Sequence, residues 1–331
     1  MVQFRPLDPA RHTRHELHDL DRDWPETNCY VDLWIEVLHA AGLDPHAMLP
    51  FVFAIDVEGD QWTFVKPPLA DLDRLYGIDV IELNVWRALE AHLDDQVARG
   101  RLPIVEVDAF HLPDTAGTTY HRVHGKTSIA IHIIDLERRR LGYFHNGGYF
   151  ALEGDDFGGV FRLDGARAPD ELPPYVEVAK LNVRPPLTGR AMLDASRDLL
   201  RRHLERRPPA NPFARYAAQI DRDLSSLVGN DLTVFHAYAF STLRQCGAAF
   251  ELGGSYLRWL QRHGDVDLDD AVRQCGVISS SAKALQFKAA RAAGAGRAFD
   301  PAPLLQTMAD AWDGAMRQLD AACGALAHQG S

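Results

Sequence analysis

The spacing of hydrophobic residues predicts a mixed first half and a helical second half. The segment NCYVDLWIEVLHAAG, at residues 28–42, repeats its apolar positions with helical periodicity and ends at Gly42. The segment RLPIVEVDAFHLP, at residues 101–113, carries an apolar run that indicates a buried strand. The segment VEVAKLNVRPPLTG, at residues 176–189, indicates another strand and then a linker.

A β-hairpin is predicted near the middle of the chain. Thr127 to Ile134 would form one strand, Asp135 to Arg140 the turn, and Leu141 to His145 the return strand. Every second residue from Ile129 to Ile133 would then share one face of the sheet.

Beyond Ala191 the strand signals nearly vanish, and several segments carry helical periodicity. We expect four to six antiparallel helices packed as a bundle. The change in pattern predicts two domains, residues 1–188 and residues 189–331. The fold class is therefore expected to be α+β, followed by a helical bundle.

Composition narrows the functional classes. The chain of 331 residues is 46% hydrophobic and 24% charged, as in an ordinary globular protein. Its formal net charge of −11 argues against a broad nucleic-acid-binding surface, although Arg138–Arg140 and Arg201–Arg202 form local basic patches. We expect no nucleic-acid partner.

The chain has no apolar run of 18 residues, and its start lacks the apolar core of a signal peptide. These features predict a cytoplasmic protein without a membrane partner. The four cysteines lie far apart with no CxxC pair, so neither a disulfide framework nor a thiolate zinc site is predicted.

Cys29 occupies the position where a catalytic cysteine is often found. It follows the helix-start residues Thr27 and Asn28, and therefore lies at the beginning of a predicted helix. Backbone N–H groups and the helix dipole lower the pKa of a thiol there, and the thiolate is the reactive form. The structural alternative is a small buried apolar side chain.

The order of polar residues along the chain favours the catalytic interpretation. Cys29 is followed by His124 at the entrance of a strand, and by Asn146 beyond the next strand. Papain-like enzymes have this order, in which the histidine takes the thiol proton and the amide orients the imidazole. His121 is an alternative base, three residues upstream of His124.

Several segments carry a family resemblance: TNCYVDLWIEVLHAAGLDP, VDAFHLPDTAGTTYHRVHGKTSIAI and LGYFHNGGYFALEGDDF. Over most of its length the chain resembles a bacterial family of uncharacterised proteins. More distantly, the first half resembles the N-terminal domain of the butirosin-biosynthesis acyltransferase. That domain is one of the papain-like proteins, which also include the bacteriocin-processing double-glycine peptidases.

The resemblance implies a papain-like (cysteine-peptidase-like) N-terminal domain with a Cys-His-Asp/Asn site. It also implies transfer of an aminoacyl group from a carrier-protein thioester to an amine. One departure concerns the base. If Asp135 is aligned with the Asp that closes the strand in the distant relatives, the histidine position falls on Thr127. Either His124 reaches in from three residues upstream, or the base has been lost.

The leading hypothesis is an acyl- or aminoacyltransferase with a small-molecule amine acceptor. Cys29 would attack the thioester on the phosphopantetheine arm of a carrier protein, His124 would move the proton and Asn146 would orient the histidine. The Cys29 backbone N–H and a donor from Asn28 or Trp24 would hold the oxyanion. The alternatives are a cysteine peptidase or amidase, and a non-catalytic protein that binds a carrier protein or a small acyl ligand.

The spacing of the histidines is compatible with a metal site in two segments. His12, His15 and His18 lie at i, i+3 and i+6, and His121 and His124 at i and i+3. An acidic or cysteine partner at diagnostic spacing is missing, and the chain contains no HExxH motif. The sequence therefore predicts neither a metal nor a cofactor.

Overall fold

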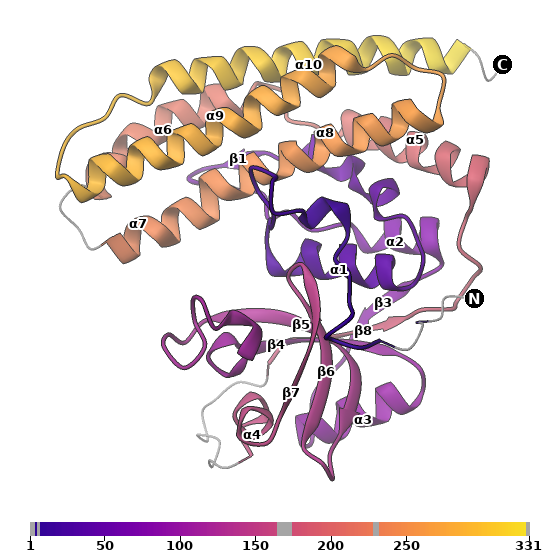
Figure 1. Cartoon of the computed structure of the whole chain (residues 1–331). Coiled ribbons are helices and arrows are strands. Elements are labelled where there is room, and N and C mark those ends of the chain that lie inside the picture. The colour runs from indigo at the N-terminus through magenta and orange to yellow at the C-terminus, as the bar shows by residue number, and fades with distance from the viewer. Residues whose placement is uncertain (1–3, 5–6, 164–173, 228–231, 329–331) are drawn as a thin grey trace. The chain divides into compact units, whose positions relative to one another are not determined.

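The computed structural model describes residues 4, 7–163, 174–227 and 232–328 (Figure 1). The chain separates into two compact units, each assembled from several segments. Unit 1 comprises Met1–Glu16, Asn28–Pro45 and Pro68–Leu187. Unit 2 comprises Leu17–Thr27, His46–Pro67 and Thr188–Ser331. Unit 1 is mixed α/β, and the C-terminal part of the chain is helical.

Unit 1 is built on a six-stranded sheet with the strand order β3-β8-β4-β5-β6-β7. All neighbouring strands pair antiparallel. The strands are β3 (Asp79–Glu82), β4 (Leu102–Asp108), β5 (Lys126–Asp135), β6 (Arg140–His145), β7 (Gly148–Glu153) and β8 (Val176–Lys180). Strands predicted near residues 104–107, 127–134, 141–145 and 176–180 are confirmed.

The helices of unit 1 cover both faces of this sheet. They are α1 (Cys29–Ala40), α2 (Leu69–Tyr76), α3 (Leu89–Ala98) and α4 (Asp155–Phe161). Val176 packs in the apolar cluster formed with α3 and α4, whereas Glu177 accepts a hydrogen bond from Tyr30 of α1. Because successive strand residues point to opposite faces, α1 lies on one face and α3 and α4 on the other.

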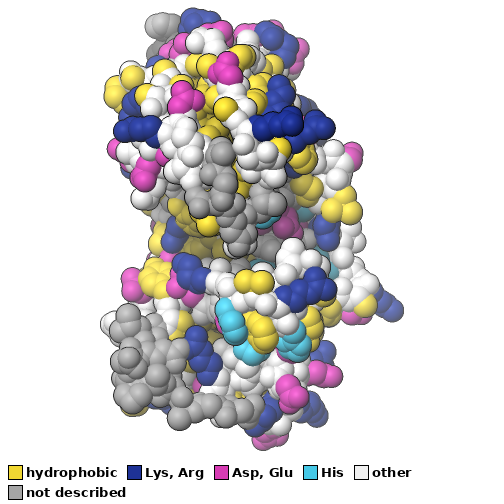
Figure 2. All heavy atoms as spheres, turned by 90° about the vertical axis from the view of Figure 1, so that its left-hand side faces the viewer, with side chains coloured by type: hydrophobic (Ala, Val, Ile, Leu, Met, Phe, Trp, Pro, Cys, Tyr) yellow, Lys and Arg dark blue, Asp and Glu magenta, His cyan; other side chains and the backbone are white. Residues whose placement is uncertain are grey.

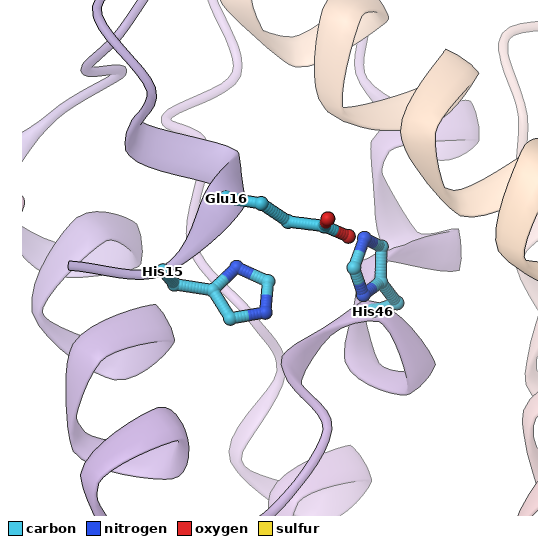
Figure 3. A group of neighbouring side chains, drawn as sticks. All are labelled: His15, Glu16 and His46. Carbon is cyan, nitrogen blue, oxygen red and sulfur yellow. The ribbon is translucent and has the colours of Figure 1, made fainter. Parts of the chain in front are cut away.

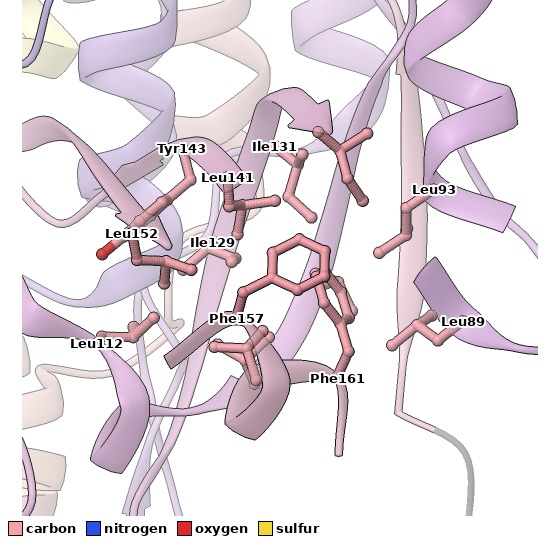
Figure 4. Close-up of a cluster of buried hydrophobic side chains, with 14 of the residues drawn as sticks. Leu89, Leu93, Leu112, Ile129, Ile131, Leu141, Tyr143, Leu152, Phe157 and Phe161 are labelled. Atoms are coloured by element: carbon pink, nitrogen blue, oxygen red, sulfur yellow. The ribbon is translucent and has the colours of Figure 1, made fainter. Parts of the chain in front are cut away.

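One apolar core of unit 1 lies beneath α3 and α4. Phe157 and Phe161 of α4 lie beside Ile129 and Ile131 of β5, which are fully buried (Figure 4). Leu93 of α3 closes the same cluster. The β-strand spacing of the apolar residues therefore produces the core that the hairpin pattern predicted.

A β-bulge in β5 changes the predicted alternation. The pairing register between β5 and β6 shifts between Ile131 and Ile133. An extra residue on one strand reverses the facing of every residue after it. The side chain of Ile133 is 42% exposed and Ile134 is buried instead. The prediction that Ile133 shares the face of Ile129 was therefore wrong.

The described part of unit 2 contains six α-helices and one short hairpin. They are α5 (Gly189–Glu205), α6 (Pro212–Leu227), α7 (Leu232–Ala239), α8 (Gln245–His263), α9 (Asp269–Gly294), α10 (Ala302–His328), β1 (Val57–Glu58) and β2 (Gln61–Trp62). A π-helical segment, Phe240–Arg244, joins α7 to α8. The long helices α8, α9 and α10 pack in succession (Figure 1).

Among the helices of the described ranges, none is both long enough and apolar enough to cross a membrane.

Gly77 ends α2 in the left-handed conformation, with φ of 66°. A Cβ at this position would overlap the backbone carbonyl of Arg184. Gly100, which follows α3, has a similar φ of 71° but open space around it. A substitution at Gly100 therefore adds backbone strain alone, whereas one at Gly77 adds both backbone strain and steric overlap.

We expect Gly100→Ala to lower the free energy of unfolding by about 1 kcal/mol, because alanine adopts the left-handed conformation at that cost. Gly77→Ala should lose about 1–3 kcal/mol more, because the neighbouring backbone must also move. Urea denaturation of the wild type and both variants measures the difference. Equal losses for the two variants would contradict the close approach to Arg184.

Candidate active site

Cys29 is the first residue of α1, as the sequence predicted. Asn28 caps the helix, because its side-chain oxygen accepts hydrogen bonds from the backbone N–H groups of Tyr30 and Val31 at 3.0 and 3.1 Å. The Cys29 thiol is partly exposed and makes no hydrogen bond with another described residue. The capping role of Asn28 commits its carbonyl oxygen to the backbone of α1.

Trp24, the other predicted oxyanion donor, belongs to unit 2. Its backbone N–H donates to Glu251 at 3.0 Å, and its indole N–H donates to the Ser279 carbonyl at 3.3 Å. The ring is buried, and the Lys283 ammonium lies 4.1 Å from its centroid. Both N–H donors of Trp24 are thus occupied within its own unit.

His124 forms a close pair with Asp108 at the end of β4. Its Nδ1 lies 2.6 Å from Asp108 Oδ2, and its ring stacks on Phe110 with centroids 4.4 Å apart. Burial acts to raise the pKa of Asp108, but hydrogen bonds from His124 and from the backbone N–H groups of Phe110 and Gly125 outweigh it and lower the pKa. An ionised Asp108 can only accept, so His124 Nδ1 carries the proton.

The His124–Asp108 pair lines a cleft of about 830 Å³ in unit 1. This volume is typical of small-molecule sites. The polar and aromatic side chains on its walls include Glu106, Asp108, His124, Lys126, Phe161 and Tyr175. Lys126 Nζ lies 2.6 Å from Glu106 Oε1. The cleft therefore contains a positive and a negative side chain in addition to the histidine.

A buried carboxylate connects this cleft to the first turn of α1. Glu177 accepts hydrogen bonds from the hydroxyl groups of Tyr30 and, at 2.9 Å, Tyr175. Burial, with the neighbouring Glu177 carboxylate, raises the pKa of Tyr30; the same two causes raise that of Tyr175 to about 12. Tyr30 follows Cys29 directly in the chain, whereas Tyr175 lines the cleft.

The remaining predicted site residues lie in turns. Asn146 has φ of 45° in the two-residue turn between β6 and β7. Asp135 ends β5, and its Oδ1 accepts a hydrogen bond from the Arg138 backbone N–H at 2.9 Å. His121 lies with Nε2 3.2 Å from Asp156 Oδ1. The structure therefore pairs His124 with Asp108, and gives Asn146 a turn position.

A buried polar network that the sequence did not predict lies on the face of the sheet opposite α1. Asp114 accepts hydrogen bonds from Tyr143 Oη at 2.5 Å and from His145 Nδ1 at 2.6 Å. His145 Nε2 in turn lies 2.8 Å from Thr127 Oγ1. Burial and the Asp114 charge raise the pKa of Tyr143.

This network has the order of hydroxyl, imidazole and carboxylate found in hydrolases. However, His145 is 1% and Thr127 7% exposed, and neither lines the cleft described above. Their contacts join β5 and β6 to the turn that holds Asp114, which indicates a structural role. In the sequence, the β-strand alternation that places Thr127 and His145 on neighbouring strands is the signal that could have indicated this network.

The histidines near the N-terminus have separate environments. His12 Nε2 lies 2.7 Å from the buried Glu36 carboxylate of α1, and the His15 backbone N–H donates to the other oxygen of Glu36 at 2.9 Å. Figure 3 draws His15 and Glu16 of unit 1 with His46 of unit 2. We assign no metal site to these three residues, because they belong to different units.

We expect Asp114→Ala to lower the free energy of unfolding by about 3 kcal/mol, because it leaves His145 and Tyr143 buried without their shared acceptor. Asp95→Ala is a matched control, since Asp95 forms an exposed pair with Arg99, and this variant should lose much less stability than Asp114→Ala. Thermal and urea denaturation measure both variants. A cost for Asp114→Ala no larger than the control would refute the structural role.

Comparison with known proteins identifies the family of this chain. The DUF1839 N-terminal domain matches residues 13–181, and the DUF1839 C-terminal domain matches residues 189–321. No curated protein matches the chain at a significant level. Because the N-terminal domain is followed by the C-terminal domain and the two cover most of the chain, the protein belongs to the two-domain DUF1839 family.

Proposed function

We propose that unit 1 is an acyl- or aminoacyltransferase that moves an acyl group from a thioester to an amine, with His124 as the general base. The observation that carries this proposal is the 2.6 Å hydrogen bond between His124 Nδ1 and Asp108 on the wall of the cleft. Asp108 holds the proton on Nδ1 and leaves the lone pair on Nε2. This is the tautomer that a general base requires.

The reaction needs only one modest general base. The amine nitrogen attacks the thioester carbonyl carbon while His124 Nε2 accepts its proton. The carbon–sulfur bond then breaks, and the thiolate leaves without prior protonation. The imidazolium later returns its proton to the thiolate or to solvent. A thioester donor therefore suits a site in which a carboxylate and an imidazole supply the acid–base chemistry.

Cys29 provides a second route within the same proposal. Its thiolate would take the acyl group first, and the amine would then attack the resulting thioester on Cys29. Its position at the N-terminus of α1 supports this role, because the backbone N–H groups and the helix dipole favour negative charge there. The hydrogen bonds through Glu177 link the neighbouring residue Tyr30 to the cleft.

The donor proposed is the phosphopantetheine thioester of an acyl or aminoacyl carrier protein, and the acceptor is a small amine. Carboxylates of the cleft, including Glu90 and Glu106, could bind a second positive charge on such an acceptor. The basic residues Arg138–Arg140, at the turn between β5 and β6 and the start of β6, offer a surface for an acidic carrier protein.

We expect His124→Ala to lower kcat/KM for acyl transfer by about 100-fold or more, because proton transfer by a positioned base contributes at least that much. The assay follows, by mass spectrometry, a panel of acyl and aminoacyl pantetheine thioesters with small amines. Asp108→Asn should also reduce the rate, because it no longer fixes the tautomer. His236→Ala, at an exposed histidine of unit 2, is the control and should keep the wild-type rate.

The Cys29→Ser variant separates the two routes. Loss of transfer, with an acylated Cys29 detected in the wild type, would establish the two-step route; retained transfer would establish direct attack. Hydrolysis in place of transfer would support the amidase alternative. Unchanged turnover in His124→Ala would contradict the proposed base. Thioesters that bind without any turnover would instead indicate a non-catalytic binding protein.

A further inference from the structure

A cluster of two histidines and one carboxylate lies in unit 1, beside the candidate base. His111 ends a short 3-10 helix after β4, His121 lies in a later turn, and Asp156 lies in the first turn of α4. One potential ligand atom from each residue lies within 4.8 Å of the other two. Figure 2 shows histidine side chains gathered on one face of the molecule, with hydrophobic side chains next to them.

The spacing of these atoms suits a metal ion. Two ligands that each lie about 2.1 Å from a tetrahedral ion are about 3.4 Å apart. His121 Nε2 and Asp156 Oδ1 are 3.2 Å apart. This pair therefore already has the separation of two metal ligands, and a ring nitrogen of His111 lies within 4.8 Å of both atoms.

The surroundings hold the ligand side chains in place. The Tyr120 hydroxyl donates to Asp156 Oδ2 at 2.8 Å, which leaves Oδ1 for an ion and orients the carboxylate as outer-shell partners do in metal sites. The ring of His111 packs against Gly159 of α4 so closely that a Cβ at residue 159 would overlap it. The segment after β4 and the start of α4 thus bring the three side chains close together.

The backbone of His121 is a further sign of a specific arrangement. Its φ is 51°, in the left-handed region that non-glycine residues seldom occupy. Such conformations concentrate at functional sites, where the surrounding structure maintains them. Here the left-handed turn accompanies a His121 ring stacked on Tyr120, 4.0 Å between centroids, with Nε2 beside Asp156.

We propose that His111, His121 and Asp156 bind a divalent transition-metal ion, with zinc the best match. Two imidazoles and one carboxylate are a zinc ligand set, and three protein ligands leave a coordination position open for water or an oxygen or nitrogen donor of a substrate. This inference goes beyond acyl transfer and does not depend on it.

The proposed metal site and the His124–Asp108 pair share one aromatic side chain. Phe110 contacts the rings of His111, His121 and His124, with centroids 5.0, 5.3 and 4.4 Å from its own. The expectation of no metal site, drawn from sequence spacing, is revised by this proposal.

The test is zinc binding by untagged protein that has first been dialysed against a chelator. Calorimetry measures the affinity, and metal analysis measures the amount of zinc bound per chain. We expect about one zinc per chain in the wild type. His111→Ala, His121→Asn and Asp156→Asn should each weaken binding by more than 100-fold, and Tyr120→Phe by about 10-fold, as for an outer-shell partner. Asparagine at residue 121 tolerates the left-handed backbone and so protects the fold.

Cobalt substitution gives a readout independent of activity, because the visible spectrum of bound Co²⁺ reports its ligands. The three ligand variants should lose the wild-type spectrum. His236→Ala and His15→Ala are controls and should bind zinc as the wild type does. Binding that is unchanged in the ligand variants, or that disappears equally in the controls, would overturn the site. Loss of acyl transfer in His124→Ala with zinc binding intact would keep the two proposals separate.

Discussion

The Asp108 carboxylate joins three parts of unit 1 at one point. It accepts hydrogen bonds from the His124 ring and from the backbone N–H groups of Phe110 and Gly125. The end of β4, the 3-10 helix after it and the entrance of β5 are fixed together by these bonds. Because Asp108 is only partly buried and its pKa is lowered by these donors, it stays ionised while it orients His124.

Phe110 extends this constraint to the surrounding histidines. Its backbone N–H donates to the Asp108 side chain that caps the short helix, and three imidazole rings pack around its ring. Aromatic contacts of this kind restrict the rings of otherwise exposed histidines. The rings of His111, His121 and His124, which include the proposed metal ligands and the proposed general base, thereby gain defined orientations.

The two faces of the sheet divide the polar chemistry of unit 1. Towards α1, the buried Glu177 carboxylate accepts hydrogen bonds from the hydroxyl groups of Tyr30 and Tyr175. Towards α3 and α4, Asp114 satisfies His145 and Tyr143 inside the apolar core. A buried charge without such partners would cost several kcal/mol, so each network is closed by hydrogen bonds. The strand alternation alone keeps the Asp114 network apart from the helix that carries Cys29.

The sequence by itself determined the elements and their order. Apolar periodicity located the helix after Asn28, the strand ending at Asp108 and the helical second half, because local spacing records which face each element buries. It also identified His124 as a candidate base. Only the tertiary structure decided its partner: Asp108, on a neighbouring strand, and not Asn146, which a left-handed φ fits to a turn. The bulge that exposes Ile133 and the meeting of His111, His121 and Asp156 were also beyond the sequence, because pairing register and contacts across 45 residues leave no local periodic signal.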